Sequence, residues 1–224
     1  MMPIDPLRTQ AAQYLDAYLG SLCAALASVD QHQLNRAAAS LDDAATRRAS
    51  IFVCGNGGSA AVANHFAADH SKGSSEGNHR RPRVHSLCAN MALFSALAND
   101  FGYSRVFESQ LANLASPGDV LVVISSSGAS PNILAALRWA RANRVTSIAM
   151  TGFAGGDART LADISIHVHC SDYGIVEDAH QALMHILAQF LRQNRLRNSA
   201  DLAHPRRWSD ASAQPSAIAI AGPE

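Results

Sequence analysis

Two short runs of small residues could hold a negatively charged group. The first is Gly55, Asn56, Gly57, Gly58 and Ser59, and the second is Ser125, Ser126, Ser127, Gly128, Ala129 and Ser130. Glycine allows close backbone approach, and free N–H groups at the start of a helix attract anions such as phosphate. A structural turn explains the first run equally well, and helix capping by serine is the alternative for the second. Four hydroxyls exceed what one cap needs, so the serine run favours phosphate.

Histidines and carboxylates form a second candidate for chemistry. His65 and Asp69 are four residues apart, so they share one face of a helix. Glu177 and His185 are eight apart, two turns along nearly the same face, with Gln181 between them. Such groups suit a metal site or acid–base catalysis. Each residue alone also fits a structural role, either an exposed ion pair or a core histidine.

The pattern of apolar segments predicts how these residues are positioned. We expect strands at 50–54, 83–87, 119–124, 145–150 and 164–169, and helices at 60–70, 90–98, 106–114, 132–143 and 176–195, with a turn at 99–102. Strands that alternate with helices and are apolar on both faces predict an α/β fold, with a parallel sheet covered on both sides. Ligands bind beyond the carboxyl ends of such strands, which is where both runs of small residues lie.

The chain divides into three segments by composition. Residues 7–49 contain no strand signal, and apolar residues such as Leu15, Leu22 and Leu26 recur at helical spacing, which predicts a helical arm over residues 1–49. Residues 50–197 hold the alternating strands and helices and form the α/β domain. Residues 198–224 are polar and rich in alanine, serine and proline, so we expect a disordered tail.

Composition restricts the class of protein. The 224 residues are 48% hydrophobic, which is typical of a globular protein. They carry no formal net charge, which argues against a nucleic-acid partner. No apolar run is long enough to span a membrane, and no signal peptide is evident. The four cysteines lack C-x-x-C spacing, which argues against a cysteine zinc site and favours free thiols in a reducing compartment. We therefore expect a cytoplasmic protein.

Together these motifs resemble those of the phosphoheptose isomerases, a family of SIS-domain proteins. The resemblance covers residues 7–195, and its landmarks are 54–61, 64–67, 98–103, 124–132, Thr151-Gly152 and Gly155-Gly156. It implies a three-layer SIS fold with a five-stranded parallel sheet and an N-terminal helical arm. The stretch 171–178 resembles a divergent branch associated with surface-polysaccharide sugars, such as those of lipopolysaccharide or capsule.

The resemblance also implies an activity. It suggests an aldose–ketose isomerase that converts sedoheptulose 7-phosphate to glycero-manno-heptose 7-phosphate through an ene-diol, working as a homotetramer with one zinc ion per subunit. Carried over by position, the zinc ligands are His65, Asp69, Glu177 and His185, and the last three of these are the catalytic groups. The substrate and its phosphate would contact Asn56, Gly57, Gly58, Ser59, Asn90, Ser125, Ser126, Ser127, Ser130 and Glu177.

The chain departs from the family pattern at four places. Asp69 stands where the family has glutamate, Glu177 where it has glutamine, and Asn90 where it usually has aspartate. The arginine common just before the glutamine position is absent, and Ile175 and Val176 stand there instead. The alternatives are a non-catalytic SIS protein that binds a phosphosugar or the bacterial replication initiator, and an SIS enzyme acting on an amino-sugar phosphate. The retained His65, Asp69 and His185 favour an isomerase over the first alternative. The match at 64–65 and 99–102 favours the heptose family over the second.

Overall fold

The computed structural model describes residues 6–73 and 82–203, and it confirms the expected α/β fold. In this part of the chain, five parallel strands form one sheet in the order β2-β1-β3-β4-β5. The strands are β1 (Ser50–Gly55), β2 (Arg83–Ser86), β3 (Val120–Ser125), β4 (Thr146–Thr151) and β5 (Ile164–His167). All four pairings are parallel, and Val53 of β1 stands opposite Val122 of β3.

Both faces of the sheet are buried at β1 and β3, as their sequences predict, whereas the edge strand β2 is exposed or half-buried. On β1, Ile51 and Val53 face one hydrophobic cluster, and Phe52 and Cys54 face the other. This alternation follows from the two-residue period of a strand, which sends successive side chains to opposite faces. Because every residue of β1 and β3 is buried, the sheet needs a layer of helices on each side.

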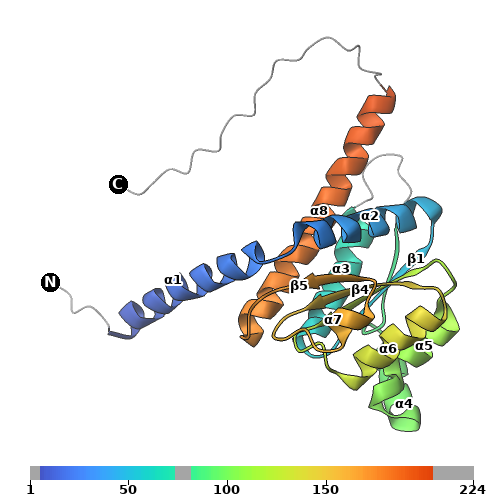
Figure 1. The fold of residues 1–224 in the computed structure, drawn as a ribbon, viewed down its shortest axis with the longest axis horizontal. Coiled ribbons are helices and arrows are strands. Elements are labelled where there is room, and N and C mark those ends of the chain that lie inside the picture. The colour runs from blue at the N-terminus through green and yellow to red at the C-terminus, as the bar shows by residue number, and fades with distance from the viewer. Residues whose placement is uncertain (1–5, 74–81, 204–224) are drawn as a thin grey trace.

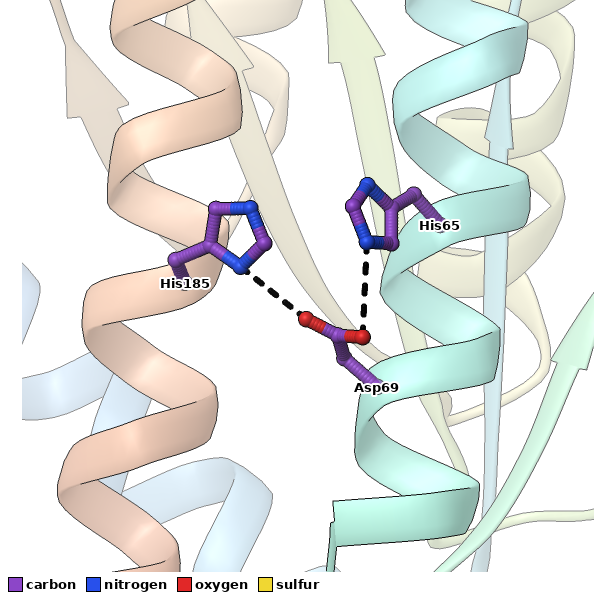
Figure 2. Close-up of side chains that lie close together, drawn as sticks. All are labelled: His65, Asp69 and His185. Atoms are coloured by element: carbon purple, nitrogen blue, oxygen red, sulfur yellow. Dashed lines mark ion pairs between the residues drawn. The ribbon is translucent and has the colours of Figure 1, made fainter.

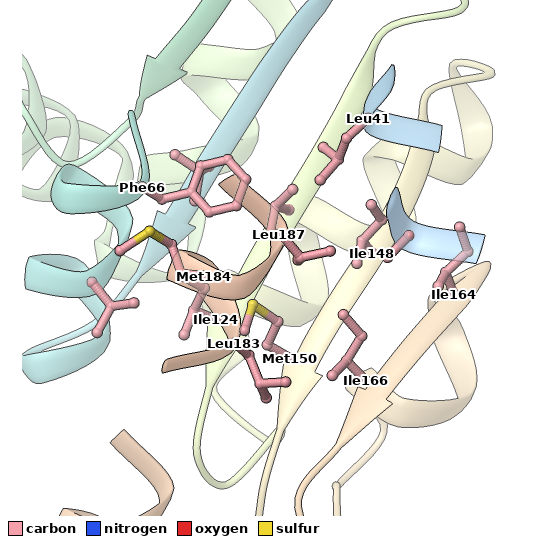
Figure 3. Close-up of a cluster of buried hydrophobic side chains, with 14 of the residues drawn as sticks. Leu41, Phe66, Ile124, Ile148, Met150, Ile164, Ile166, Leu183, Met184 and Leu187 are labelled. Atoms are coloured by element: carbon pink, nitrogen blue, oxygen red, sulfur yellow. The ribbon is translucent and has the colours of Figure 1, made fainter. Parts of the chain in front are cut away.

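The helices supply those two layers (Figure 1). Helices α2 (Gln31–Arg47), α3 (Gly58–Gly73) and α8 (Tyr173–Ala203) pack on one face. Helices α4 (Met91–Phe101), α5 (Val106–Leu114), α6 (Pro131–Ala142) and α7 (Ala158–Leu161) pack on the other, and the short 3-10 helix η1 (Tyr103–Arg105) joins α4 to α5. Figure 3 shows the first core, where Leu183 and Met184 of α8 lie with Phe66 of α3, Ile124 of β3 and Met150 of β4.

Helix α1 (Pro6–Ala27) projects from this body as an arm (Figure 1). Its last turns contribute Leu22, Ala25 and Leu26 to the first core. Further out, the Tyr18 hydroxyl donates a 2.6 Å hydrogen bond to the Asp178 carboxylate of α8. This bond favours the protonated phenol and raises the pKa of Tyr18 to about 12. The arm is therefore tied to α8 by apolar packing at its end and by one hydrogen bond.

Several element boundaries differ from the sequence prediction. Residues 99–101 extend α4 instead of forming a turn, and the helix ends at Gly102, which has a φ of 86°. The sequence gives no helix breaker before this glycine, which can adopt a positive φ without strain. Helix α7 was not expected, because a single turn is too short to show periodicity. Helix α8 begins at Tyr173 and extends to Ala203, past the expected boundary at 197, while the rest of the expected tail lies outside the described residues.

The strand order reverses at the centre of the sheet. From β1 the chain passes through α3 to β2 on one side, whereas β3 pairs with β1 on its other side and leads through α6 to β4. Helices α3 and α6 therefore leave adjacent strands toward opposite faces. In α/β sheets this reversal opens a crevice beyond the strand ends. Within the described ranges, no helix combines the length and apolar character needed to cross a membrane.

His180 is a buried titratable group on α8. Its side chain is fully shielded from solvent, and neither ring nitrogen forms a hydrogen bond of acceptable geometry. Burial lowers the pKa of His180 to about 4, although the nearby Thr151 backbone partly favours the charged ring. The unfolded chain therefore binds a proton near the ordinary pKa of 6.5 that the folded chain accepts only near pH 4. Stability must fall as the pH drops through that interval.

We expect the free energy of unfolding to decrease by about 2 kcal/mol between pH 7 and pH 5 because of His180 alone. Replacing the imidazole by an apolar side chain, His180→Met, removes this proton uptake and should flatten the pH dependence by that amount. Urea unfolding of both proteins at the two pH values measures the difference. An equal loss of stability in both would contradict the prediction.

Candidate functional site

The serine run lies between β3 and α6, at the reversal of strand order. The Gly128 backbone N–H donates to the Ser125 hydroxyl at 3.2 Å, and the Ala129 N–H donates to the Ser127 hydroxyl at 3.3 Å. Ser130 occupies the N-cap position of α6, but its side chain makes no capping hydrogen bond. The Ser130 hydroxyl is thus not used for capping, which was the structural alternative for this run.

A cavity of about 150 Å³ lies over this run of serines. It is lined by residues from the two turns and from the start of α8: Asn56, Ser59, Ser125, Ser126, Ser127, Ser130, Tyr173 and Glu177. The Ser126 hydroxyl is shielded from solvent and has no hydrogen-bond partner. A buried hydroxyl without a partner is costly, so a ligand oxygen that bonded to it would be favoured. We call this cavity the serine pocket.

The glycine turn brings β1 and α3 close to neighbouring groups. A Cβ at Gly58, the first residue of α3, would overlap the Glu177 carboxylate. On the serine side, Gly128 has a φ of +64°, and a Cβ there would overlap the backbone carbonyl of Gly155. Glycine is therefore required at Gly128 by the space available and by the backbone conformation, whereas a side chain at Gly58 would have to displace the Glu177 carboxylate.

Two asparagines join the turns beneath the pocket. The Asn56 amide donates to the side-chain oxygen of Asn132 at 3.0 Å, and the Asn132 amide donates back to Asn56 at 2.8 Å. The Tyr103 hydroxyl also donates to the Asn56 oxygen at 2.8 Å. Asn132 is buried and Asn56 is half-buried, and their paired hydrogen bonds hold the glycine and serine turns at a fixed spacing. Tyr103, Asn132 and Tyr173 were not among the predicted site residues.

The histidine and aspartate side chains meet between α3 and α8 (Figure 2). Asp69 lies between two imidazoles: one of its oxygens is 3.4 Å from His65 Nε2, and the other is 2.9 Å from His185 Nδ1. The two rings contact edge to face, with centroids 4.9 Å apart. Aspartate, one methylene shorter than the glutamate of the family pattern, therefore still reaches both rings.

These three side chains could hold a metal ion. Each offers one ligand atom, and the three atoms lie within 4.8 Å of one another. Two imidazole nitrogens and one carboxylate oxygen suit a divalent cation such as zinc, whose catalytic sites have three protein ligands and one open position. All three side chains are partly exposed, so a small molecule could reach that position.

Gln181 completes this cluster, although it was not predicted as a site residue. Its side-chain amide nitrogen lies 2.8 Å from His65 Nδ1 and 2.9 Å from His185 Nε2. The position of Gln181 on the stripe between Glu177 and His185 was visible in the sequence. The sequence does not predict the rotation of α8 about its axis, and this rotation decides which residues of the stripe face α3.

Glu177 is not part of the group of mutually close ligand atoms formed by His65, Asp69 and His185, although it was expected to join them. Its carboxylate lies against Gly58 and lines the serine pocket. Eight helical residues rise about 12 Å, so Glu177 and His185 lie at different levels along α3. Asn90 also lies apart from the lining of the serine pocket: it is the N-cap of α4, and its side chain accepts a 3.0 Å hydrogen bond from the Leu93 N–H.

This chain resembles known proteins both in sequence and in fold. Residues 13–152 match the SIS domain family. Phosphoheptose isomerases from Nitratidesulfovibrio vulgaris and Mycobacterium bovis are 38% and 40% identical over 143 and 146 residues, which cover 64% and 63% of this chain and 68% and 71% of theirs. The solved phosphoheptose isomerase of Neisseria gonorrhoeae has a TM-score of 0.76 at 27% identity and covers 84% of this chain and 99% of its own. The solved phosphoheptose isomerase of Francisella tularensis has a TM-score of 0.75 at 25% identity and covers 85% of this chain and 100% of its own.

Proposed function

The chain belongs to the SIS-domain family and is a sugar-phosphate isomerase, and we propose that it converts sedoheptulose 7-phosphate to glycero-manno-heptose 7-phosphate. The observation that carries this proposal is the meeting of His65, Asp69 and His185 between α3 and α8, on the same pair of helices that borders the serine pocket. The relatives named phosphoheptose isomerase support the choice of a seven-carbon substrate.

The serine pocket is the proposed site for the substrate phosphate. Ser125, Ser127 and Ser130 present hydroxyls, and the Ser126 hydroxyl lacks a protein partner. The starts of α3 and α6 add backbone N–H groups and the partial positive charge of a helix N-terminus, so no lysine or arginine is required. In this arrangement the carboxylate of Glu177 would face the sugar hydroxyls next to the phosphate, and it would repel a second anionic group.

Isomerisation needs groups that move protons between neighbouring carbons and oxygens. A base removes the proton from C1 of the ketose, an ene-diol forms, and an acid returns a proton to C2 while the oxygens exchange theirs. We assign the transfer at carbon to Asp69 and the transfer between oxygens to His185. Positioned acid–base groups of this kind contribute about 10²- to 10⁴-fold each.

The same side chains fit a zinc ion, as the donor set of two nitrogens and one oxygen indicates. His65, Asp69 and His185 would hold it, and it would supply a Lewis acid that polarises the substrate carbonyl. Glu177 is not part of this proposed ligand set, because its carboxylate lies at the serine pocket.

We expect the triple substitution of Ser125, Ser127 and Ser130 by alanine to raise KM for the phosphosugar by at least 10-fold. Three hydroxyl hydrogen bonds to a charged phosphate are lost, and bonds to charged groups contribute about 1.5–3 kcal/mol each. Steady-state kinetics measures KM, and circular dichroism confirms that the fold is retained. Ser116→Ala, a serine outside the pocket, is the control. An unchanged KM would contradict the phosphate assignment.

We expect His185→Ala to reduce the rate of isomerisation by at least 10²-fold with little loss of stability, because it removes a partly exposed site group and leaves the core volume intact. Asp69→Asn should do the same if Asp69 is the base. NMR detection of sedoheptulose 7-phosphate turnover, with and without zinc, measures both variants, and His32→Ala on the exposed face of α2 is the control. Full activity of His185→Ala would refute the proposed site, and turnover of amino-sugar phosphates alone would redirect the substrate assignment.

We also propose that the enzyme is a homotetramer. Helix α1 exposes Tyr14, Leu15 and Leu19, and α8 exposes Ile186 and Phe190, so both leave large apolar side chains in solvent. Burial of such groups is the main favourable term in subunit association. Analytical ultracentrifugation should give the mass of four chains at micromolar concentration. A monomer that keeps its activity would contradict the proposal.

A further inference from the structure

We propose that Gln181 is a positioning residue, which holds His65 and His185 by their outer ring nitrogens and leaves the nitrogens that face Asp69 available to a divalent cation. This inference rests on the metal site of the proposed function. It concerns a residue that lies within hydrogen-bond distance of both imidazoles and that would act only through them.

The four side chains form a closed ring of contacts. His65 turns Nε2 toward Asp69 and Nδ1 toward Gln181, at 3.4 Å and 2.8 Å. His185 does the reverse, turning Nδ1 toward Asp69 and Nε2 toward Gln181, both at 2.9 Å. Every ring nitrogen therefore has one partner. A cation that shares Asp69 with both histidines must bind the two inner nitrogens, and Gln181 stays on the outer side.

In the metal-free state, the hydrogen bonds among the four side chains define which ring nitrogens carry hydrogen. The Gln181 amide nitrogen carries two hydrogens and can donate one to each histidine, so both outer nitrogens accept. In a neutral imidazole the other nitrogen then carries the hydrogen. His65 is therefore protonated on Nε2 and His185 on Nδ1, and both N–H groups point at the Asp69 carboxylate, which can only accept.

A bound cation reverses this arrangement. The inner nitrogens then need their lone pairs, so each ring carries its hydrogen on the outer nitrogen and requires an acceptor there. Half a turn of the Gln181 amide about its last side-chain bond presents Oε1, whose two lone pairs can accept both hydrogens. Gln181 is only partly buried, which leaves room for that rotation. A glutamate at this position could accept the hydrogens of the cation-bound state but could not donate to the imidazoles in the metal-free state. A methionine could do neither.

This reasoning predicts an order of zinc affinities. Gln181→Met keeps the side-chain volume but removes both hydrogen bonds, and it should weaken zinc binding by about 10- to 100-fold, as loss of such outer partners does. Gln181→Glu keeps the acceptor and should bind zinc at least as tightly as the unmodified chain. Gln189→Met, an exposed position two turns further along α8, should have no effect. Competition with a chelating dye measures all four affinities.

Nitrogen NMR of the histidine rings gives a readout that requires neither activity nor metal. In the metal-free chain, His185 should carry its hydrogen on Nδ1, the less common tautomer of a free histidine. The addition of zinc should move that hydrogen to Nε2. The substitution Gln181→Glu without zinc sets a second carboxylate against Nε2 and should place a hydrogen there, while Asp69 still faces Nδ1. A purely structural role of Gln181 in packing α8 against α3 would leave the tautomer unchanged in Gln181→Glu.

Separate results overturn the proposal for Gln181 and the proposed metal site. The role of Gln181 would be refuted if Gln181→Met bound zinc as tightly as the unmodified chain. It would also be refuted if Gln181→Glu bound zinc as weakly as Gln181→Met. An Nε2 hydrogen on His185 in the metal-free chain would refute it as well. If the unmodified chain binds no zinc, the metal site of the proposed function fails, and the metal-free spectra still decide whether Gln181 holds the rings.

Discussion

The position of the candidate site depends on the reversal of strand order between β1 and β3. Because the chain leaves these adjacent strands toward opposite faces of the sheet, the glycine turn and the serine run open toward one crevice. The Asn56–Asn132 pair fixes their spacing, and Gly128 allows the serine run to pack against the backbone of Gly155. An anion at this point would meet hydroxyls and the starts of two helices, which is why a pocket lined by neither lysine nor arginine can still offer a phosphate site.

The second half of the site depends on how α8 buries its apolar side. Leu183, Met184 and Leu187 enter the core with Phe66 of α3, and this packing fixes the rotation of α8 about its axis. The polar stripe of Gln181 and His185 borders the buried side, so it turns toward the polar face of α3, where His65 and Asp69 lie. The dense packing of the core thus aligns groups that belong to different helices, with a precision that exposed ion pairs alone would not provide.

The local geometry also explains how this chain accommodates its departures from the family pattern. Asp69 is shorter than glutamate, but both of its oxygens reach an imidazole, one from its own helix and one from α8. Glu177 brings a charge to a position where the family has glutamine, and the chain holds that charge at the serine pocket, against the start of α3. A carboxylate is favoured near the N-terminus of a helix, where the helix dipole is positive.

Much of this protein could be predicted from its sequence. The strands are apolar on both faces, so they had to lie in a covered parallel sheet, and the spacing of His65 and Asp69 placed both on one helical face. The sequence could not decide which residues of the α8 stripe share a site. Glu177, Gln181 and His185 are nearly equivalent by periodicity, and the separation of Glu177 from His185 follows from the height and rotation of α8 against α3. Those two quantities are set by non-local packing of the core, which no local pattern of residues encodes.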